Sequence, residues 1–347
     1  MFQARGSMSR RGILAGGAAM AGTLAMPHVA KAQVPRLRYA TGGGLGANEI
    51  VTIHLMDWMK DNVLKRHGKN YVLDVTYTRG TPEAASLLAA GQADFATLSL
   101  PAFATAIAKN AVPGGMKIVA DNFQDAREGY ASQVFYVLDD SSIKTIPDLK
   151  GKTIAVNAFG TAVDLLLRVA LKKNGLDPRR DVRIVEISFP SIGAAIREKR
   201  VDCGVLPLPF GATERAKGGL RAVFQGKDAL PPYAVIFQVA TENFLKAQPA
   251  VAKAWLADYV AGLQWLYALE NRKKAVELAA TLSKSPPEVV DSYFLTKNDY
   301  FRDPNACLGA EQVQPPLDAM VAEGLLSARI DAKPYVDMSF LPRPCSA

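Results

Sequence analysis

The chain has 347 residues, 49% of them hydrophobic, and a formal net charge of +8. This length exceeds what a single hydrophobic core usually fills, so two domains are expected. No long run of Lys or Arg occurs, which argues against a nucleic-acid partner.

The first 32 residues are typical of an export signal. Arg10 and Arg11 precede a weakly apolar, Gly/Ala-rich run, and Ala30-Lys31-Ala32 matches an A-x-A cleavage site. Paired arginines before a mild apolar run resemble a twin-arginine signal. The segment has four basic residues and no acidic one, so its removal lowers the net charge to +4. We therefore predict an exported protein that starts at Met1 or Met8 and is cleaved near Ala32. No later segment is long and apolar enough to cross a bilayer.

Strand and helix patterns alternate from residue 36 to residue 206, which predicts an α/β protein built from parallel βαβ units. The predicted strands are Leu37–Ala40, Tyr71–Thr78, Asp94–Leu98, Met116–Ala120, Thr153–Asn157, Val182–Ile187 and Val201–Leu206. Helices are predicted over 48–65, from Thr81 as N-cap, from Pro101, over the apolar stripe Val163–Leu171, and over Ser191–Lys199.

Two apolar stretches without helix signals, Ser132–Leu138 and Tyr233–Ala240, are predicted to connect the two lobes. From Thr241 onward the sequence is helical, and an aromatic stripe that includes Trp255 and Tyr259 indicates packing on the first lobe. We therefore assign residues 33–135 and 236–347 to lobe 1 and residues 136–235 to lobe 2.

One pattern occurs twice, 108 residues apart: an Asp, a short apolar strand and a proline that precedes a helix. The copies are Asp94–Pro101 and Asp202–Pro209. Such a repeat indicates two similar lobes, and a cleft between lobes can hold a small molecule. A generic βα similarity between the two segments is the alternative.

In open parallel sheets, ligands bind beside the carboxyl ends of the strands. The loop after the first predicted strand is rich in glycine, so its backbone N–H groups can approach a ligand closely. Gly43, Gly44 and Leu45 are therefore candidate contacts, although a purely structural turn is an alternative. The G-x-G-x-x-A match here lacks the acidic residue of a dinucleotide site, so no cofactor is predicted.

Two other loops carry groups suited to an anion. Gly160 and Thr161 combine N–H groups, a hydroxyl and the positive end of a helix. Arg79 ends a predicted strand, where its guanidinium could hold a carboxylate or sulfonate with two hydrogen bonds. Alternatively, Thr161 only caps its helix and Arg79 is a solvated charge.

The tips of the repeated segments complete the predicted site. Ser99 and Leu100 lie at the tip of the first copy and Leu208 at the tip of the second. We expect Leu100, Leu208 and Phe159 to supply apolar walls.

Three cysteines occur in the chain. Cys203 lies inside a predicted strand and is expected to be a small buried residue. Cys307 and Cys345 both lie in Pro/Gly-rich loop sequence near the C-terminus, and in an oxidising compartment we predict that they form a disulfide. The cysteine spacings of a zinc site are absent, so no metal is predicted.

Catalytic constellations are missing after residue 32. Only His54 and His67 remain, and neither pairs convincingly with a Ser or Cys. No G-x-S-x-G, H-E-x-x-H or P-loop motif occurs. In an exported two-lobed protein this favours binding over catalysis, with His54 as a structural histidine.

The segment Ile146-Pro-Asp-Leu-Lys-Gly-Lys-Thr-Ile-Ala-Val156 resembles the start of the second lobe in periplasmic substrate-binding proteins of ABC importers. Gly160-Thr161, Lys172–Asp177 and the turn Ala89–Asp94 make the chain most similar to the nitrate/sulfonate/taurine-binding, NMT1/THI5-like branch. The cysteine-rich motif of the pyrimidine-synthesising enzymes of this branch is absent.

The resemblance implies a type II periplasmic-binding-protein fold, in which two βαβ domains are joined by two crossing strands. It implies a periplasmic, monomeric protein that captures a small organic anion, a sulfonate or carboxylate, and delivers it to an ABC permease. The alternative is an enzyme or sensor domain that reuses the fold, for example one that acts on a thiamine-precursor-like pyrimidine.

Overall fold

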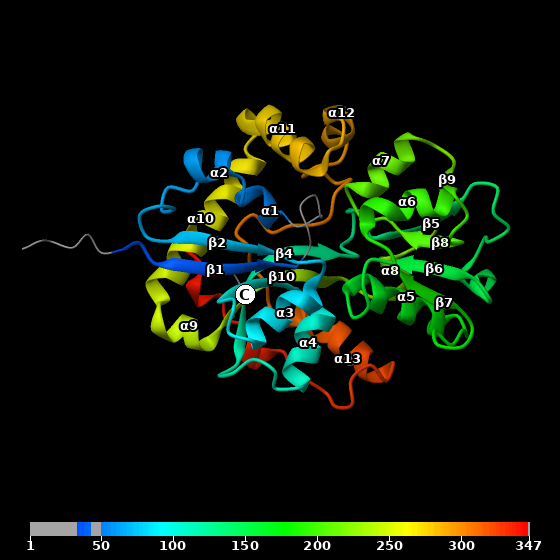
Figure 1. The fold of residues 1–347 in the computed structure, drawn as a ribbon, viewed down its shortest axis with the longest axis horizontal. Coiled ribbons are helices and arrows are strands. Elements are labelled where there is room, and N and C mark those ends of the chain that lie inside the picture. Colours follow the sequence, from blue (N-terminus) through cyan, green and yellow to red (C-terminus); the bar gives the residue numbers. More distant parts are fainter. Residues whose placement is uncertain (1–32, 43–49, 346–347) are drawn as a thin grey trace, which may run out of the picture. The chain divides into compact units, whose positions relative to one another are not determined.

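A computed structural model describes residues 33–42 and 50–345 (Figure 1), and the predicted export signal lies outside them. The described residues contain two five-stranded sheets. The first has the order β2-β1-β3-β10-β4 and the second the order β7-β6-β8-β5-β9. The strands of the first sheet are β1 (Arg36–Thr41), β2 (Val72–Tyr77), β3 (Phe95–Ser99), β4 (Met116–Asp125) and β10 (Tyr233–Thr241). Those of the second are β5 (Val134–Leu138), β6 (Thr153–Val156), β7 (Arg183–Glu186), β8 (Cys203–Val205) and β9 (Leu220–Gln225).

The two sheets share one topology. In the first sheet β1 pairs in parallel with β2 and β3, and in the second sheet β6 pairs in parallel with β7 and β8. The inner strands β10 and β5 instead pair antiparallel with both of their neighbours. The sheets are therefore mixed, whereas the sequence pattern predicted parallel sheets, because β5 and β10 carry the chain between the two series and run against the βαβ direction.

The repeated Asp has the same structural role in both sheets. The Asp94 carboxylate accepts a hydrogen bond from the Arg38 backbone N–H at 3.1 Å, and the Asp94 N–H donates to the Arg38 carbonyl at 2.8 Å. Asp202 makes the same two bonds with Thr153, at 2.8 and 2.9 Å. Each Asp thus fixes the start of the third strand against the first, and the repeat reflects two copies of one packing unit.

Helices cover the sheets. They are α1 (Val51–His54), α2 (Asp57–Asn62), α3 (Thr81–Ala89), α4 (Leu100–Ala108), α5 (Ala162–Lys173), α6 (Phe189–Arg197), α7 (Phe210–Ala216), α8 (Gly226–Ala229), α9 (Glu242–Ala247), α10 (Pro249–Tyr267), α11 (Arg272–Ser283), α12 (Pro287–Asp291) and α13 (Gln314–Ala322). Short 3-10 turns are η1 (Ile146–Leu149), η2 (Leu269–Asn271), η3 (Ala310–Gln312), η4 (Lys333–Tyr335) and η5 (Met338–Phe340).

Two details of the predicted helices are corrected. The single helix expected over 48–65 is divided into α1 and α2, because Met56 adopts an extended backbone and serves as the N-cap of α2. The N-cap of α3 is Gly80, not Thr81, so Thr81 is already the first helical residue.

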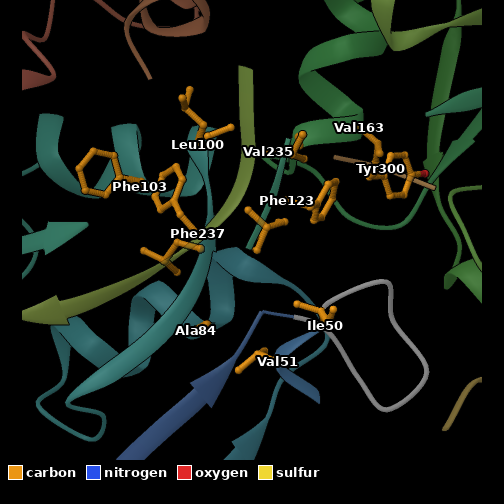
Figure 2. Packing of buried hydrophobic residues seen from close by; sticks show 14 of the residues in the cluster. Ile50, Val51, Ala84, Leu100, Phe103, Phe123, Val163, Val235, Phe237 and Tyr300 are labelled. Atoms are coloured by element: carbon orange, nitrogen blue, oxygen red, sulfur yellow. The ribbon is translucent and has the colours of Figure 1, made fainter. Parts of the chain in front are cut away.

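The aromatic stripe of α10 packs on the first sheet, as expected. The ring centroids of Trp255 and Tyr39 are 5.5 Å apart, and Trp255 Nε1 donates to Gln238 Oε1 at 2.9 Å. Further along the sheet, Phe103 of α4 packs edge-on against Phe237 of β10 at 5.5 Å (Figure 2). The core of the first sheet therefore combines strands that precede the second sheet in sequence with β10, which follows it.

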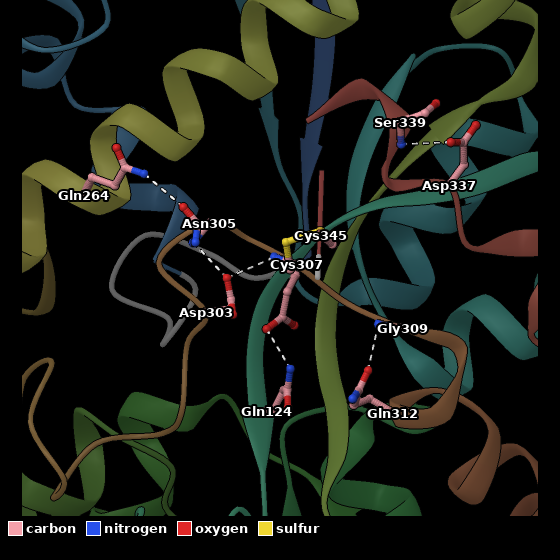
Figure 3. The surroundings of a disulfide bond; sticks show 11 residues. Gln124, Gln264, Asp303, Asn305, Cys307, Gly309, Gln312, Asp337, Ser339 and Cys345 are labelled. Carbon is pink, nitrogen blue, oxygen red and sulfur yellow. Dashed lines mark hydrogen bonds between the residues drawn. A yellow bond between two sulfur atoms is a disulfide. The ribbon is translucent and has the colours of Figure 1, made fainter. Parts of the chain in front are cut away.

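The structure joins Cys307 and Cys345, the predicted pair, in a disulfide (Figure 3). The Cys307 N–H donates to Asp303 Oδ1 at 3.2 Å, and the Asp337 N–H donates to the carbonyl of Ile118 in β4 at 2.9 Å. The C-terminal tail is thus attached to an edge of the first sheet. Cys203 is unpaired and fully buried in β8, and burial raises the pKa of its thiol to about 12.

Candidate ligand-binding site

A cavity of about 500 Å³ lies where the carboxyl ends of strands from both sheets meet. Gly42 follows β1, Tyr77 ends β2, Ser99 ends β3 and Glu186 ends β7. The described residues that line it are Gly42, Tyr77, Thr78, Arg79, Thr81, Ser99, Phe123, Gln133, Asn157, Thr161, Ala162, Val163, Glu186, Ser188, Phe189, Pro190, Phe210, Val235 and Ile236. This placement agrees with the rule that ligands bind at the carboxyl ends of strands in open α/β sheets.

Four helices begin at this cavity. Ser99, Thr161 and Ser188 are the N-caps of α4, α5 and α6, and Thr81 is the first residue of α3; all four line the cavity. None of the three N-cap hydroxyls accepts a hydrogen bond from its own helix. The first N–H groups of a helix have no intrahelical partner and carry a partial positive charge, so these termini favour an anion.

The hydroxyl groups of Thr81, Ser99 and Thr161 contribute polar atoms to the cavity wall. Thr81 Oγ1 and Ser99 Oγ are 2.7 Å apart. Thr161 Oγ1 lies 2.8 Å from the Ala158 carbonyl and 3.1 Å from Asn157 Oδ1, to either of which it can donate its one hydrogen. The Thr161 hydroxyl therefore points back into its own loop and does not cap α5.

The formal charges that line the cavity cancel. Among the described lining residues, Arg79 is the one cation and Glu186 the one anion. The Arg79 side chain is 93% exposed and pairs with Glu83 at 3.2 Å. Glu83 accepts a hydrogen bond from the Arg79 backbone N–H, which has the larger effect, and another from the Arg79 side chain. Both lower the pKa of the Glu83 carboxyl. Glu186 accepts a hydrogen bond from the Phe159 N–H at 2.6 Å.

Asp164 already occupies part of the α5 terminus. Its carboxylate accepts a hydrogen bond from the Gly160 N–H at 2.9 Å and another from Arg168 Nε at 2.8 Å. Burial nevertheless raises the pKa of Asp164. The N–H of Gly160, which the sequence pattern offered to a ligand, is therefore engaged within the protein.

The remaining wall is apolar and rich in aromatic rings. Phe189 and Phe210 stack with ring centroids 5.9 Å apart and an interplanar angle of 24°. Tyr77, on the first sheet, keeps 45% of its surface exposed. Phe123 belongs to β4 of the first sheet and Val163 to α5, which follows β6 of the second sheet, and both line the cavity.

Three of the predicted site residues, Arg79, Ser99 and Thr161, line this cavity. The others that the structure describes do not. Leu100 is fully buried in the hydrophobic core, and Phe159, although 47% exposed, is not part of the lining. Leu208 lines a separate cavity of about 290 Å³ and donates its N–H to Tyr300 at 3.1 Å.

Gly160 is also absent from the lining residues, and its N–H donates to Asp164. Gly43, Gly44 and Leu45 lie outside the described residues. The sequence reasoning missed Tyr77, Glu186, Ser188, Phe189 and Phe210 as lining residues. A signal did exist for the first four, which lie at the end of a strand or within three residues of it, where ligand loops occur; Phe210 instead begins α7.

His54 is structural, as the sequence reasoning favoured. Its ring is fully buried, with Nδ1 3.1 Å from the Ile50 carbonyl and Nε2 3.0 Å from the Tyr259 carbonyl. Across residues 33–42 and 50–345, no group of three His, Cys, Asp or Glu side chains is arranged to hold a metal ion. Over the same ranges, no helix is both long and apolar enough to span a membrane.

Comparisons with known proteins agree with this architecture. The model of the NMT1-like family matches residues 31–280. A curated protein of Escherichia coli (strain K12), named for binding aliphatic sulfonates, is 27% identical over 166 residues, which cover 47% of this chain and 49% of that protein. The chain thus spans about half the length of that relative.

Two solved structures show the fold. The alkanesulfonate-binding protein SsuA of Xanthomonas axonopodis pv. citri, bound to MOPS, has a TM-score of 0.69 at 20% identity, over 88% of this chain and 99% of that one. The periplasmic nitrate-binding protein NrtA of Synechocystis PCC 6803 has a TM-score of 0.65 at 14% identity, over 89% and 87%. The chain therefore has the two-domain α/β fold of periplasmic binding proteins, consistent with type II.

Proposed function

Because the chain belongs to the NMT1-like family, we propose that it is the solute-binding component of an ABC import system. It captures a small organic anion, a sulfonate or carboxylate, in the cavity at the strand ends and delivers it to a membrane permease. The names of similar proteins support this role, since they describe binders of alkanesulfonates, aliphatic sulfonates and nitrate. We further propose that it acts as a periplasmic monomer after cleavage near Ala32.

The observation that carries the proposal is the convergence of α3, α4, α5 and α6 on one cavity. Their N–H groups and hydroxyls provide donors for an acidic group although the lining side chains carry no net charge. Such neutral donors, together with the positive ends of the helices, favour an anion. Arg79, at the exposed edge, adds a weaker and screened attraction.

The proposed anion contacts are Thr161 and Arg79, which come from elements of different sheets. The Thr161 hydroxyl can donate to an anion only when its hydrogen turns away from Ala158 and Asn157, and on this basis we expect Thr161→Ala to bind about tenfold more weakly. Arg79→Ala should cost less, since the guanidinium is exposed and paired with Glu83. Isothermal titration calorimetry with the strongest binder from a panel of sulfonates and carboxylates measures both effects.

Arg36→Ala is the matched control, because Arg36 is also an exposed arginine on the first sheet with an acidic partner, Asp74, but does not line the cavity. Unchanged affinity in both Thr161→Ala and Arg79→Ala would remove these residues from the site.

Export is tested separately. The protein should be recovered from the periplasmic fraction, and its intact mass should correspond to a chain that begins near Gln33. Recovery of chemically unchanged ligand distinguishes binding from turnover.

A further inference from the structure

We infer that the ligand carries an aromatic body, so that the preferred solutes are aryl sulfonates or aryl carboxylates. This inference rests on the proposed function and names the substrate class of the same site. It follows from the separation of polar and aromatic groups along the cavity wall.

The polar end of the cavity is formed by hydroxyl groups of the first sheet's elements and by the loop before α5. Thr81 and Ser99 share a hydrogen bond, and Gly80, next to Thr81, lies so that a Cβ atom there would be 3.6 Å from Ala158 Cβ and 3.9 Å from Asn157 Nδ2. Asn157 and Ala158 are in turn the partners of the Thr161 hydroxyl. The hydroxyls of Thr81, Ser99 and Thr161 therefore lie in one region, beside the N-termini of their helices. The Thr81–Ser99 pair uses one of its two hydroxyl hydrogens, and the other can be donated to an acidic head group together with the helix N–H groups.

The aromatic end is built by helices α6 and α7. Phe189 and Phe210 are the first residues of these helices, and their rings stack at 5.9 Å. Both residues are only partly buried and pack against the hydrophobic core. Because both rings line the cavity, part of their remaining surface faces it. An apolar surface left open in a cavity favours a ligand that covers it, and aromatic pairs gain a further preference for a ring over an alkyl chain.

The size of the cavity supports the same ligand class. About 500 Å³ lies within the range of sites that enclose organic molecules of drug size. A small inorganic anion, or methanesulfonate, would fill only the polar end and leave the ring surfaces of Phe189, Phe210 and Tyr77 without a partner.

Calorimetric titration of the wild-type protein with matched acids tests this. Benzenesulfonate is compared with methanesulfonate, benzoate with acetate, and benzenesulfonate with the uncharged benzenesulfonamide. We expect each aromatic acid to bind at least tenfold more tightly than its methyl counterpart, and benzenesulfonate to bind at least tenfold more tightly than benzenesulfonamide.

Variants locate the effect. Phe189→Leu and Phe210→Leu keep an apolar side chain but remove the ring, and each should weaken benzenesulfonate binding about three- to tenfold while leaving methanesulfonate binding unchanged. Phe159→Leu is the matched control, since Phe159 is an exposed phenylalanine outside the cavity lining.

The outcomes separate the two proposals. Equal affinities of benzenesulfonate and methanesulfonate would overturn the aromatic class and leave the proposed function intact. Equal affinities of benzenesulfonate and benzenesulfonamide would overturn the anionic ligand and leave the aromatic class intact. If none of the five compounds binds, both proposals fail. The wild-type comparison decides the question even if a Phe variant does not fold.

Discussion

At the scale of single residues, His54 shows how a polar side chain is placed in the core. Both ring nitrogens face backbone carbonyls, but a neutral imidazole can donate with only one of them. The ring fits because Gly262 on α10 has no side chain; a Cβ atom there would overlap the imidazole. Burial lowers the pKa of His54 to about 4, while the two carbonyls and Asp258 oppose the shift.

This pKa predicts a dependence of stability on pH. The pKa of His54 is lower in the folded chain than the ordinary 6.5, so protons favour the unfolded chain. The contribution of His54 to the unfolding free energy is complete above about pH 6.5 and declines as the pH falls toward 4, by up to about 1.4 kcal/mol per pH unit. Urea unfolding at several pH values measures it.

The matched control for this prediction is His54→Gln, which keeps a polar side chain that does not titrate. Other groups titrate in the same range, including Asp121, whose pKa burial raises to about 7, so the difference between wild type and variant is the relevant quantity. That difference should change between pH 6.5 and pH 4. Parallel pH profiles would show that His54 does not titrate as described.

At the scale of elements, the N-terminus of α3 meets the loop before α5. Gly80 has an extended backbone (φ −177°) that any residue can adopt, so its importance lies in the space it leaves. A Cβ atom at Gly80 would touch Ala158 and Pro82 at 3.6 Å, which is ordinary van der Waals contact. The N-terminus of α3, next to the first sheet, and the loop before α5, next to the second sheet, are therefore in contact beside the cavity.

A larger side chain at this contact should hold the two elements apart. We expect Gly80→Leu to bind benzenesulfonate about tenfold more weakly than Gly80→Ala, because the Leu side chain extends beyond the available space. Both substitutions place a poor N-cap residue before α3 and share that cost, at most about 1 kcal/mol, so their comparison isolates side-chain size. Equal calorimetric affinities of the two variants would exclude a role of this contact in ligand binding.

At the scale of the whole molecule, the first sheet contains strands that precede the second sheet in sequence and one, β10, that follows it. β10 pairs with β3 and β4, and the segments after it return to the same sheet. The disulfide closes a loop with a sequence separation of 38 residues, so the C-terminal tail cannot leave the sheet edge independently.

Loss of this disulfide should destabilise the protein. In the chain-entropy model a loop of this size contributes about 4 kcal/mol, so the Cys307→Ala/Cys345→Ala variant should unfold at clearly lower denaturant concentration. Cys203→Ala is the control that keeps the bridge. Reduction with dithiothreitol should lower the unfolding midpoint of wild type and Cys203→Ala but not of the double variant. No difference between wild type and the double variant would contradict a stabilising bridge.

The sequence by itself determined the alternation of strands and helices, the equivalence of the Asp94 and Asp202 segments and three lining residues, Arg79, Ser99 and Thr161. These depend on local patterns: where a strand ends, what begins the next helix, and which residue starts a repeat. A strand end places its residue at the sheet edge whatever the rest of the chain does.

The tertiary structure alone decided which side chains face the cavity. Leu100 and Leu208 occupy loop positions as favourable as that of Ser99, yet one points into the core and the other into a second cavity. Phe189 and Phe210 become neighbours only because α6 and α7 begin side by side. The direction of a side chain at a helix start depends on how that helix packs on its sheet, and this packing is set by contacts between residues distant in sequence.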